Sequence, residues 1–204
     1  MFLRNPFRTI IVTGIPGVGK TTVLGILLQE ASKIGLRVEV ANFGDYMLRE
    51  AVRIGLVKDR DQLRKLPHRQ QLELQKIAAK AIINDAKTKL SEKDLLIIDT
   101  HCVVKTTAGY WPGLPRHVIE ELNPDSIVLI EADPELIAQR RARDVTRNRK
   151  DLGGKEEIKE MIEMARAAAM AAATITASSV YIVINPEGHP EEAAQSILAL
   201  VEKL

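Results

Sequence analysis

The sequence of 204 residues contains one cysteine, Cys102, so it can form neither an internal disulfide nor a cysteine-rich zinc site. A chain with so little cysteine suits a reducing interior. No apolar run approaches the ~20 residues of a membrane span, and we expect no signal peptide, because no hydrophobic segment precedes the first strand pattern. The sequence therefore predicts a cytoplasmic protein without a membrane partner.

An excess of charge of one sign is also lacking. The net charge is +2 at pH 7, which is too small to argue for a nucleic-acid or anionic-membrane partner, so any basic site must be local. There is no internal repeat and no low-complexity linker. With 46% hydrophobic residues, the chain is long enough for one domain with a real core and small inserts.

Apolar, β-branched runs alternate with helical patterns along the chain. The runs are Thr9–Thr13, Arg37–Asn42, Leu95–Asp99, Ser126–Glu131 and Val180–Asn185. The expected helices run from Lys20 to about Ile34, from about Asp45 to Ile54, from His68 to Leu90, from Asp133-Pro134, from about Lys155 to Ser178, and onward from Pro190. Continuous apolar runs fit strands buried on both faces. The alternation predicts an α/β fold, a parallel sheet with helices on both faces.

Three polar or glycine-rich stretches fit this alternation poorly: Lys58–Pro67, Thr106–Pro115 and Thr146–Gly154. In an open α/β sheet, ligands bind beyond the carboxyl ends of the strands, where crossovers of this kind can reach. We expect Thr106–Pro115 to be a rigid loop whose two aromatic residues line a nucleobase pocket or pack the loop on the core.

A complete G-x-x-x-x-G-K-[ST] motif stands between the first strand and the first helix, the context in which this motif is a phosphate-binding loop. It consists of Gly14, Ile15, Pro16, Gly17, Val18, Gly19, Lys20 and Thr21. Its glycines let backbone N–H groups surround phosphates, and the positive end of the following helix points to the same place. We expect Lys20 to reach the β- and γ-phosphates of ATP, Thr21 to bind Mg²⁺, and Thr22 to lie beside the α-phosphate.

Asp99 ends the apolar run of the third strand. A carboxylate at the carboxyl end of such a strand could orient Mg²⁺, directly or through water. The alternative is an aspartate that only caps the strand exit. His101 follows two residues later. It could contact a base or a phosphate of a nucleotide that accepts the phosphoryl group, or be a polar residue at a strand end.

Five arginines fall between Gln139 and Lys150. Arg140 and Arg143 are spaced i, i+3 and would share one helical face, whereas Arg147 and Arg149 fall in an expected loop. Phosphoryl transfer spreads negative charge over oxygens that guanidinium groups can stabilise. Beside a P-loop, we interpret the segment as a catalytic lid. The alternatives are a solvated basic surface and a nucleic-acid patch.

No general base is evident in the sequence. A hydroxyl acceptor usually needs one, whereas a nucleoside monophosphate is already anionic at pH 7, because its phosphate has a second pKa of about 6. Arg60 and Arg64 are spaced i, i+4 and could grip such a phosphate from one helical face. The alternative is a salt-bridged surface helix, since Asp59 and Asp61 are adjacent.

Taken together, eight stretches resemble the archaeal-type adenylate kinases nearly end to end. They are GIPGVGKTT, NFGDYM, DRDQLRKL, IDTH, GYWPGLP, ELNP, EADP and RDVTRNR. The resemblance implies a P-loop fold with strand order 2-3-1-4-5, the reversible Mg²⁺-dependent conversion of ATP and AMP to two ADP, and a homotrimer. It also implies a core of residues 1–42, 91–138 and 155–204, a monophosphate-binding insert at about 43–90, and a lid at about 139–154.

The same resemblance assigns roles to individual residues. It places Lys20, Thr21, Arg64, Arg140, Arg143, Arg147 and Arg149 at the phosphates, with Asp99 near Mg²⁺. The broader adenylate kinases carry T-G-D-x-L-R beside AMP, which assigns Gly44 to the acceptor. In this sequence Phe43 replaces the threonine, and Arg49 stands one residue further along than the family arginine.

Other P-loop activities remain to be weighed. A kinase for CMP or UMP stays open, because base choice depends on pocket contacts that sequence does not place. A switch GTPase needs N-K-x-D for guanine, which is absent, and Asp99 is followed by Thr-His-Cys rather than by x-x-Gly. A nucleic-acid-dependent ATPase would use the arginines as a phosphate track.

Overall fold

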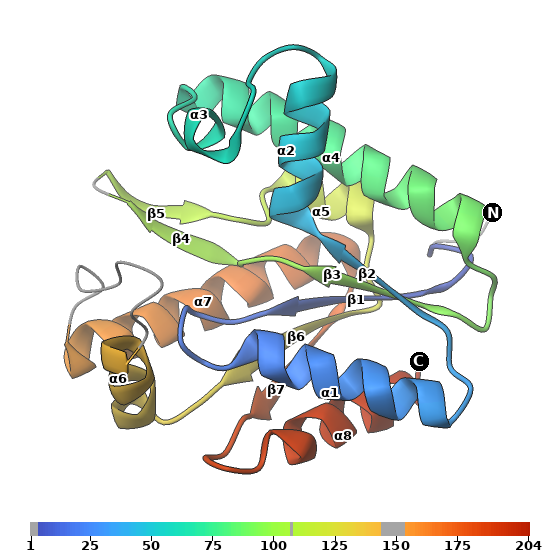
Figure 1. The fold of residues 1–204 in the computed structure, drawn as a ribbon, viewed down its shortest axis with the longest axis vertical. Helices are drawn as coiled ribbons and strands as arrows, with labels where there is room; N and C mark the ends of the chain where they lie inside the picture. The colour runs from blue at the N-terminus through green and yellow to red at the C-terminus, as the bar shows by residue number, and fades with distance from the viewer. Residues whose placement is uncertain (1–3, 107, 144–153) are drawn as a thin grey trace.

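The protein is described from a computed structural model that covers residues 4–106, 108–143 and 154–204. A parallel five-stranded sheet forms its centre (Figure 1), with the order β2-β3-β1-β6-β7. Its strands are β1 (Arg8–Thr13), β2 (Val38–Asn42), β3 (Leu95–Asp99), β6 (Ser126–Glu131) and β7 (Ser179–Ile184). Numbered among themselves these strands run 2-3-1-4-5, so the predicted α/β class and strand order are both confirmed.

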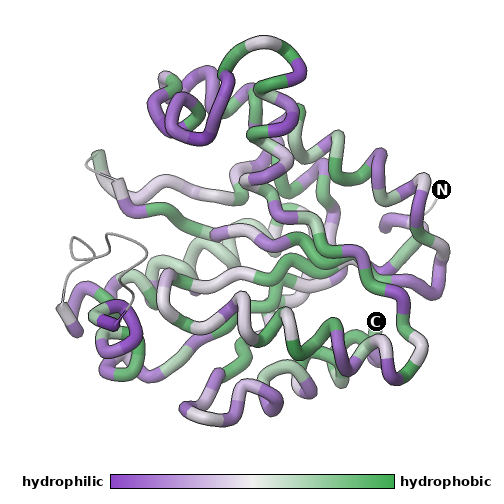
Figure 2. Tube along the Cα trace, viewed as in Figure 1, coloured by the Kyte–Doolittle hydropathy of each residue, from purple (hydrophilic) through white to green (hydrophobic). Residues whose placement is uncertain are grey.

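Helices cover both faces of the sheet. On one face lie α1 (Lys20–Lys33) and α8 (Pro190–Val201), and on the other lie α4 (His68–Lys89), α5 (Arg116–Leu122) and α7 (Lys155–Thr176). Successive strand residues point to opposite faces, so Ile10 packs into the core under α1 and α8, while Ile11 packs into the core under α4, α5 and α7. Figure 2 shows the resulting hydrophobic band along the central strands.

Local capping decides where the predicted helices begin and end. The helix α2 (Phe43–Arg53) begins two residues earlier than expected, because the side chain of Asn42 accepts a hydrogen bond from the Asp45 N–H at 3.1 Å. The helix α6 (Pro134–Arg143) begins as predicted, since Asp133 Oδ1 accepts from the Glu135 N–H at 2.8 Å. Gly35, with φ of +71°, follows the end of α1 as expected.

The prediction of a loop at Thr106–Pro115 is wrong for half of the segment. Thr106 and Gly109–Pro112 belong to a two-stranded antiparallel hairpin of β4 (Val103–Thr106) and β5 (Gly109–Pro112), and the short helix α5 follows, which the periodicity did not reveal. Glycine and proline suggested a loop, but Gly109, with φ of +105°, shapes the turn and Pro112 ends the second strand. Strands of four residues are too short to show a clear alternation.

Beyond the carboxyl end of β2, three helices pack into a smaller unit: α2, the short α3 (Arg60–Arg64) and the first half of α4. Ala51, Val57, Leu63 and Leu74 form a separate hydrophobic cluster within it. Within the part of the chain that the structure describes, no helix combines the length and apolar character that crossing a membrane requires.

Candidate active site

A cleft of about 1070 Å³ opens beyond the carboxyl ends of the central strands. Its P-loop end is lined by Ile15, Pro16, Gly17, Val18, Gly19, Lys20, Thr21, Thr22 and Arg140, its middle by Asn42, Asp99, Thr100 and His101, and its other end by Phe43, Gly44, Met47, Arg60, Arg64, Gln75, Val104 and Gly113. Most of the predicted site residues therefore share one continuous space, although they come from segments far apart in the sequence.

The P-loop turns sharply between β1 and α1. Gly17 and Gly19 have φ of +97° and +89°, a region that only glycine enters readily. Space is also tight at Gly19, where a Cβ atom would lie 2.4 Å from Nδ2 of Asn185. These two positions therefore need glycine for both conformation and room, as a loop that curls around phosphate requires.

Lys20 is held at the carboxyl end of β3. Its Nζ lies 2.5 Å from Oδ1 of Asp99 and donates to the backbone oxygen of Thr100 at 2.7 Å. The other carboxylate oxygen of Asp99 accepts from Nδ2 of Asn42 at 2.8 Å. The sequence analysis did not predict Asn42 as a site residue. Like Asp99, it is a polar residue at the end of a strand, and that position could have indicated a place in the site. These contacts hold the ammonium group of Lys20 in the middle of the cleft.

Three side chains hold the P-loop from behind by its carbonyl groups. Nε of Arg141 donates to the Pro16 oxygen at 2.8 Å, while Nδ2 of Asn185 and Nη1 of Arg140 donate to the Val18 oxygen at 2.7 and 3.2 Å. Arg141 and Asn185 are buried. Arg141 had been missed, although it lies i+4 from the buried Ile137 and so on the inward face of α6.

Replacing Arg141 with methionine is expected to raise the KM for ATP by roughly 10-fold, because the Pro16 carbonyl loses a charge-assisted hydrogen bond of about 1.5–3 kcal/mol. The KM for the second nucleotide should change much less. Steady-state kinetics with each substrate varied in turn would measure both constants. Arg116→Met is the matched control, because Arg116 is exposed, pairs with Glu120 and does not line the cleft. An unchanged KM for ATP with a lower melting temperature would make Arg141 only a packing residue.

The predicted arginine cluster is divided by the structure. Arg140 lines the cleft and its Nη2 also bonds Oε2 of Glu187 at 2.8 Å. Arg143, at the exposed end of α6, does not line the cleft that the described residues form. Arg147 and Arg149 lie outside the described residues. The catalytic roles of Arg143, Arg147 and Arg149 therefore stay predictions.

At the acceptor end, Arg60 and Arg64 both line the cleft and both contact carboxylates. Arg60 pairs with Asp45, and Nη1 of Arg64 lies 3.3 Å from Oδ1 of Asp61. The two interpretations of this short helix are therefore compatible: its arginines form salt bridges, and they also line the cleft. Exposed pairs contribute about 0–1 kcal/mol, so a phosphate dianion can displace these carboxylates at little cost.

Of the two remaining candidates for the acceptor site, His101 lines the cleft and Arg49 does not. Nδ1 of His101 lies 3.1 Å from the Gly14 oxygen, at the middle of the cleft. Arg49 does not line the cleft; it bonds Asp85 at 2.7 Å, which holds the pKa of that carboxyl below its usual range.

The two aromatic residues of the hairpin do not line the cleft either. Tyr110 packs against the hydrophobic cluster that contains Val103 of β4 and Ile158 of α7, and Trp111 stacks on His68 with ring centroids 3.9 Å apart. Of the two interpretations of this segment, the structure favours packing on the protein, because neither ring lines the cleft that the described residues form.

A parallel sheet with a P-loop after its first strand, opening on a cleft lined by lysine and arginine, defines a P-loop kinase. Residues 13–159 match the family model described as the AAA domain. Two solved kinases share the fold: a sugar kinase from Janibacter sp. (TM-score 0.53, 16% identity, covering 97% of this chain and 95% of that one) and a shikimate kinase from Bacteroides thetaiotaomicron (TM-score 0.52, 19% identity, 96% and 98%).

Curated archaeal proteins are much closer in sequence. An adenylate kinase from Saccharolobus solfataricus is 48% identical over 188 residues, or 92% of this chain and 96% of that protein. Adenylate kinases from Methanopyrus kandleri and Methanocaldococcus jannaschii are 46% and 42% identical, each over 96% of this chain and 98% of theirs. The chain belongs to the adenylate kinase family, in agreement with the resemblance found from its motifs.

Proposed function

We propose that the protein catalyses the reversible, Mg²⁺-dependent transfer of the terminal phosphoryl group of ATP to AMP, giving two ADP. The observation that carries this proposal is the single cleft in which the P-loop and the pair Arg60 and Arg64 stand at opposite ends. The adenylate kinase relatives, at 42–49% identity over almost the whole chain, support it.

In this proposal the two ends of the cleft bind two polyanions, and the residues between them lower the barrier by position and charge. The P-loop amides and Lys20 hold the donor phosphates, and Arg60 and Arg64 hold the acceptor phosphate. Arg140, within the same cleft, offsets charge on the transferred group. No proton acceptor is required of the protein, because the attacking phosphate oxygen is already anionic.

The cleft offers oxygen donors that fit Mg²⁺, which prefers oxygen ligands and keeps several waters. Thr21, an exposed residue directly after the P-loop lysine, and Asp99, at the end of β3, both line the cleft. Both oxygens of Asp99 are already engaged by Lys20 and Asn42, which favours a role for Asp99 through water. When bound, the ion neutralises charge on the β- and γ-phosphates.

Three further features belong to the same proposal on the strength of the family resemblance. The insert at about 43–90 and the lid at about 139–154 close over the nucleotides, the protein assembles as a homotrimer, and it works in the cytoplasm. The separate hydrophobic cluster of Ala51, Val57, Leu63 and Leu74 supports the insert as a unit that can move on its own.

Incubating the purified protein with Mg²⁺, ATP and AMP should yield two ADP for each AMP consumed, as measured by ion-exchange chromatography of the nucleotides. CMP, UMP and GMP in place of AMP should react far more slowly. A bisubstrate inhibitor with two adenosines joined by five phosphates should bind much more tightly than ATP. Absence of ADP with intact ATP binding would reject the proposal, and turnover that needs RNA or DNA instead of AMP would favour an ATPase.

A further inference from the structure

Asn42 and Asp99 are the last residues of β2 and β3, and the parallel register sets them side by side. The Nδ2 of Asn42 donates to one carboxylate oxygen of Asp99 at 2.8 Å, and the other oxygen lies 2.5 Å from Nζ of Lys20. Hydrogen bonds to an ionised carboxylate are strong, so the two contacts together fix the plane of this carboxylate. Asn42 therefore acts on the ammonium group of Lys20 through Asp99.

The amide of Asn42 is itself held at its other end. Its oxygen accepts from the Asp45 N–H at 3.1 Å and so caps α2, which follows β2 directly (Figure 1). Because the oxygen faces a donor and the nitrogen faces a carboxylate, only one orientation of the amide satisfies both contacts. Space is limited as well, since a Cβ atom at Gly44 would lie 3.3 Å from this oxygen. Turning the side chain would break both bonds.

Capping alone does not require an asparagine. Aspartate and serine cap helices about as well, because a cap needs only an oxygen. Aspartate at this position would set a second carboxylate against Asp99, and the serine hydroxyl lies one bond closer to the backbone, too short to bridge both partners. The amide supplies an acceptor for α2 and a donor for Asp99 at once, so the bond to Asp99 is what asparagine adds.

We propose that Asn42 is a positioning residue for phosphoryl transfer: it orients the carboxylate of Asp99 and thereby aims Lys20 at the phosphates on the P-loop. This inference rests on the proposed function, because the position of Lys20 matters for the transfer step. Asn42 lines the middle of the cleft and caps the first helix of the acceptor insert. The placement of the donor lysine thus depends on the helix that begins the acceptor side.

The substitution Asn42→Ser separates positioning from capping, since serine keeps the cap and drops the bond to Asp99. It should lower kcat by roughly 10-fold, because a displaced cation no longer matches the transferred group, with both KM values within about 2-fold of wild type. Asn42→Ala also removes the cap, so it should show the same loss of kcat and melt about 2–4 °C lower. Asn84→Ser, at an exposed position of α4 outside the cleft that the described residues form, should keep the wild-type kcat.

A double-mutant cycle with Lys20→Ala asks whether Asn42 acts through Lys20. In the Lys20→Ala background, Asn42→Ser should lower kcat by less than about 2-fold, since no ammonium group remains to be aimed. A purely structural role would give the same roughly 10-fold loss in both backgrounds, and that result would overturn the inference. So would a wild-type kcat in Asn42→Ser. All four proteins are compared at a temperature at which each is folded, so that lost stability cannot imitate the effect.

The inference and the proposed function fail separately. If the wild-type protein makes no ADP from AMP, the proposed function fails, and the position of Lys20 is then followed without turnover. In nucleotide-free protein that contains isotope-labelled lysine, the nitrogen NMR signal of Lys20, identified by its loss in Lys20→Ala, should move in Asn42→Ser. It should stay in place in Asn84→Ser. An unchanged signal in Asn42→Ser would overturn the inference whatever the activity of the protein.

Discussion

Lys20→Ala is expected to lower kcat by about 10²- to 10³-fold, the usual cost of removing one fixed donor of positive charge at a developing anion. Lys20 is held by Asp99 and the Thr100 carbonyl, so it is already in place before substrates bind. Such a group needs no reorganisation during the reaction, which is why its loss should affect turnover more than affinity. Coupled-assay kinetics with saturating ATP and AMP would measure the loss.

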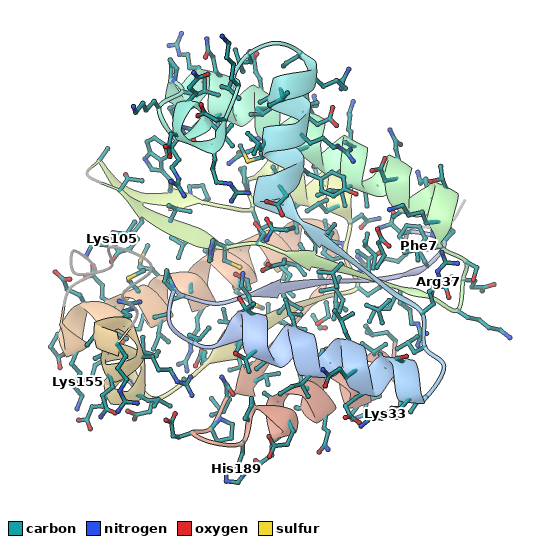
Figure 3. The ribbon with its side chains drawn as sticks, in the orientation of Figure 1. Phe7, Lys33, Arg37, Lys105, Lys155 and His189 are labelled. Atoms are coloured by element: carbon teal, nitrogen blue, oxygen red, sulfur yellow. The ribbon has the colours of Figure 1, made fainter. Side chains whose placement is uncertain are left out.

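Lys33→Ala provides the control for this experiment. Figure 3 shows Lys33 at the far end of α1 from the P-loop, where its Nζ donates to Oε1 of Glu30 at 2.7 Å. Its removal should leave kcat unchanged, because exposed ion pairs contribute about 0–1 kcal/mol. Turnover of Lys20→Ala close to wild type would contradict the donor site placed on the P-loop. The melting temperature of each variant should be recorded, since Lys20→Ala also leaves Asp99 without its cation.

The sheet could be predicted because the sequence signals for its strands and helices each span only a few neighbouring residues. Five continuous apolar runs, the P-loop between a strand and a helix, and the Asp133-Pro134 cap each act over a few residues, and parallel strands then bring their carboxyl ends to one edge. For the same reason, Lys20 and Asp99 could be expected near each other, although 79 positions separate them in the sequence. The structure sets them 2.5 Å apart.

The missed features depend on contacts between distant segments. The hairpin of β4 and β5 is held by pairing across a short turn, so composition alone suggested a loop. Arg141 was grouped with its neighbours as one basic segment, but burial against Pro16 and Gly17 gives it a different task from Arg143.

Gly113→Ala is expected to destabilise the protein by about 3 kcal/mol or more, because no side chain can rotate away from the clash. A Cβ atom at this position would lie 1.8 Å from the backbone oxygen of His101 and 2.9 Å from its carbonyl carbon. The N–H of Gly113 also donates to the Cys102 oxygen at 2.7 Å, so the end of β5 lies directly on the segment that follows β3. Alanine must push these two segments apart.

The segment that alanine would displace contains Thr100 and His101, which line the middle of the cleft. The Thr100 carbonyl bonds Lys20, and His101 contacts the Gly14 oxygen, so moving the backbone here disturbs the P-loop as well. Gly113→Ala should therefore lose activity even at temperatures where it remains folded, as thermal unfolding and kcat/KM measured together would show. Gly25→Ala is the matched control: it lies on α1 with nothing within 4 Å of its Cβ position, and alanine there should be neutral or slightly stabilising. Equal melting temperatures for the two variants would show that the β5 end can move aside at no cost, and would contradict the tight contact between Gly113 and His101.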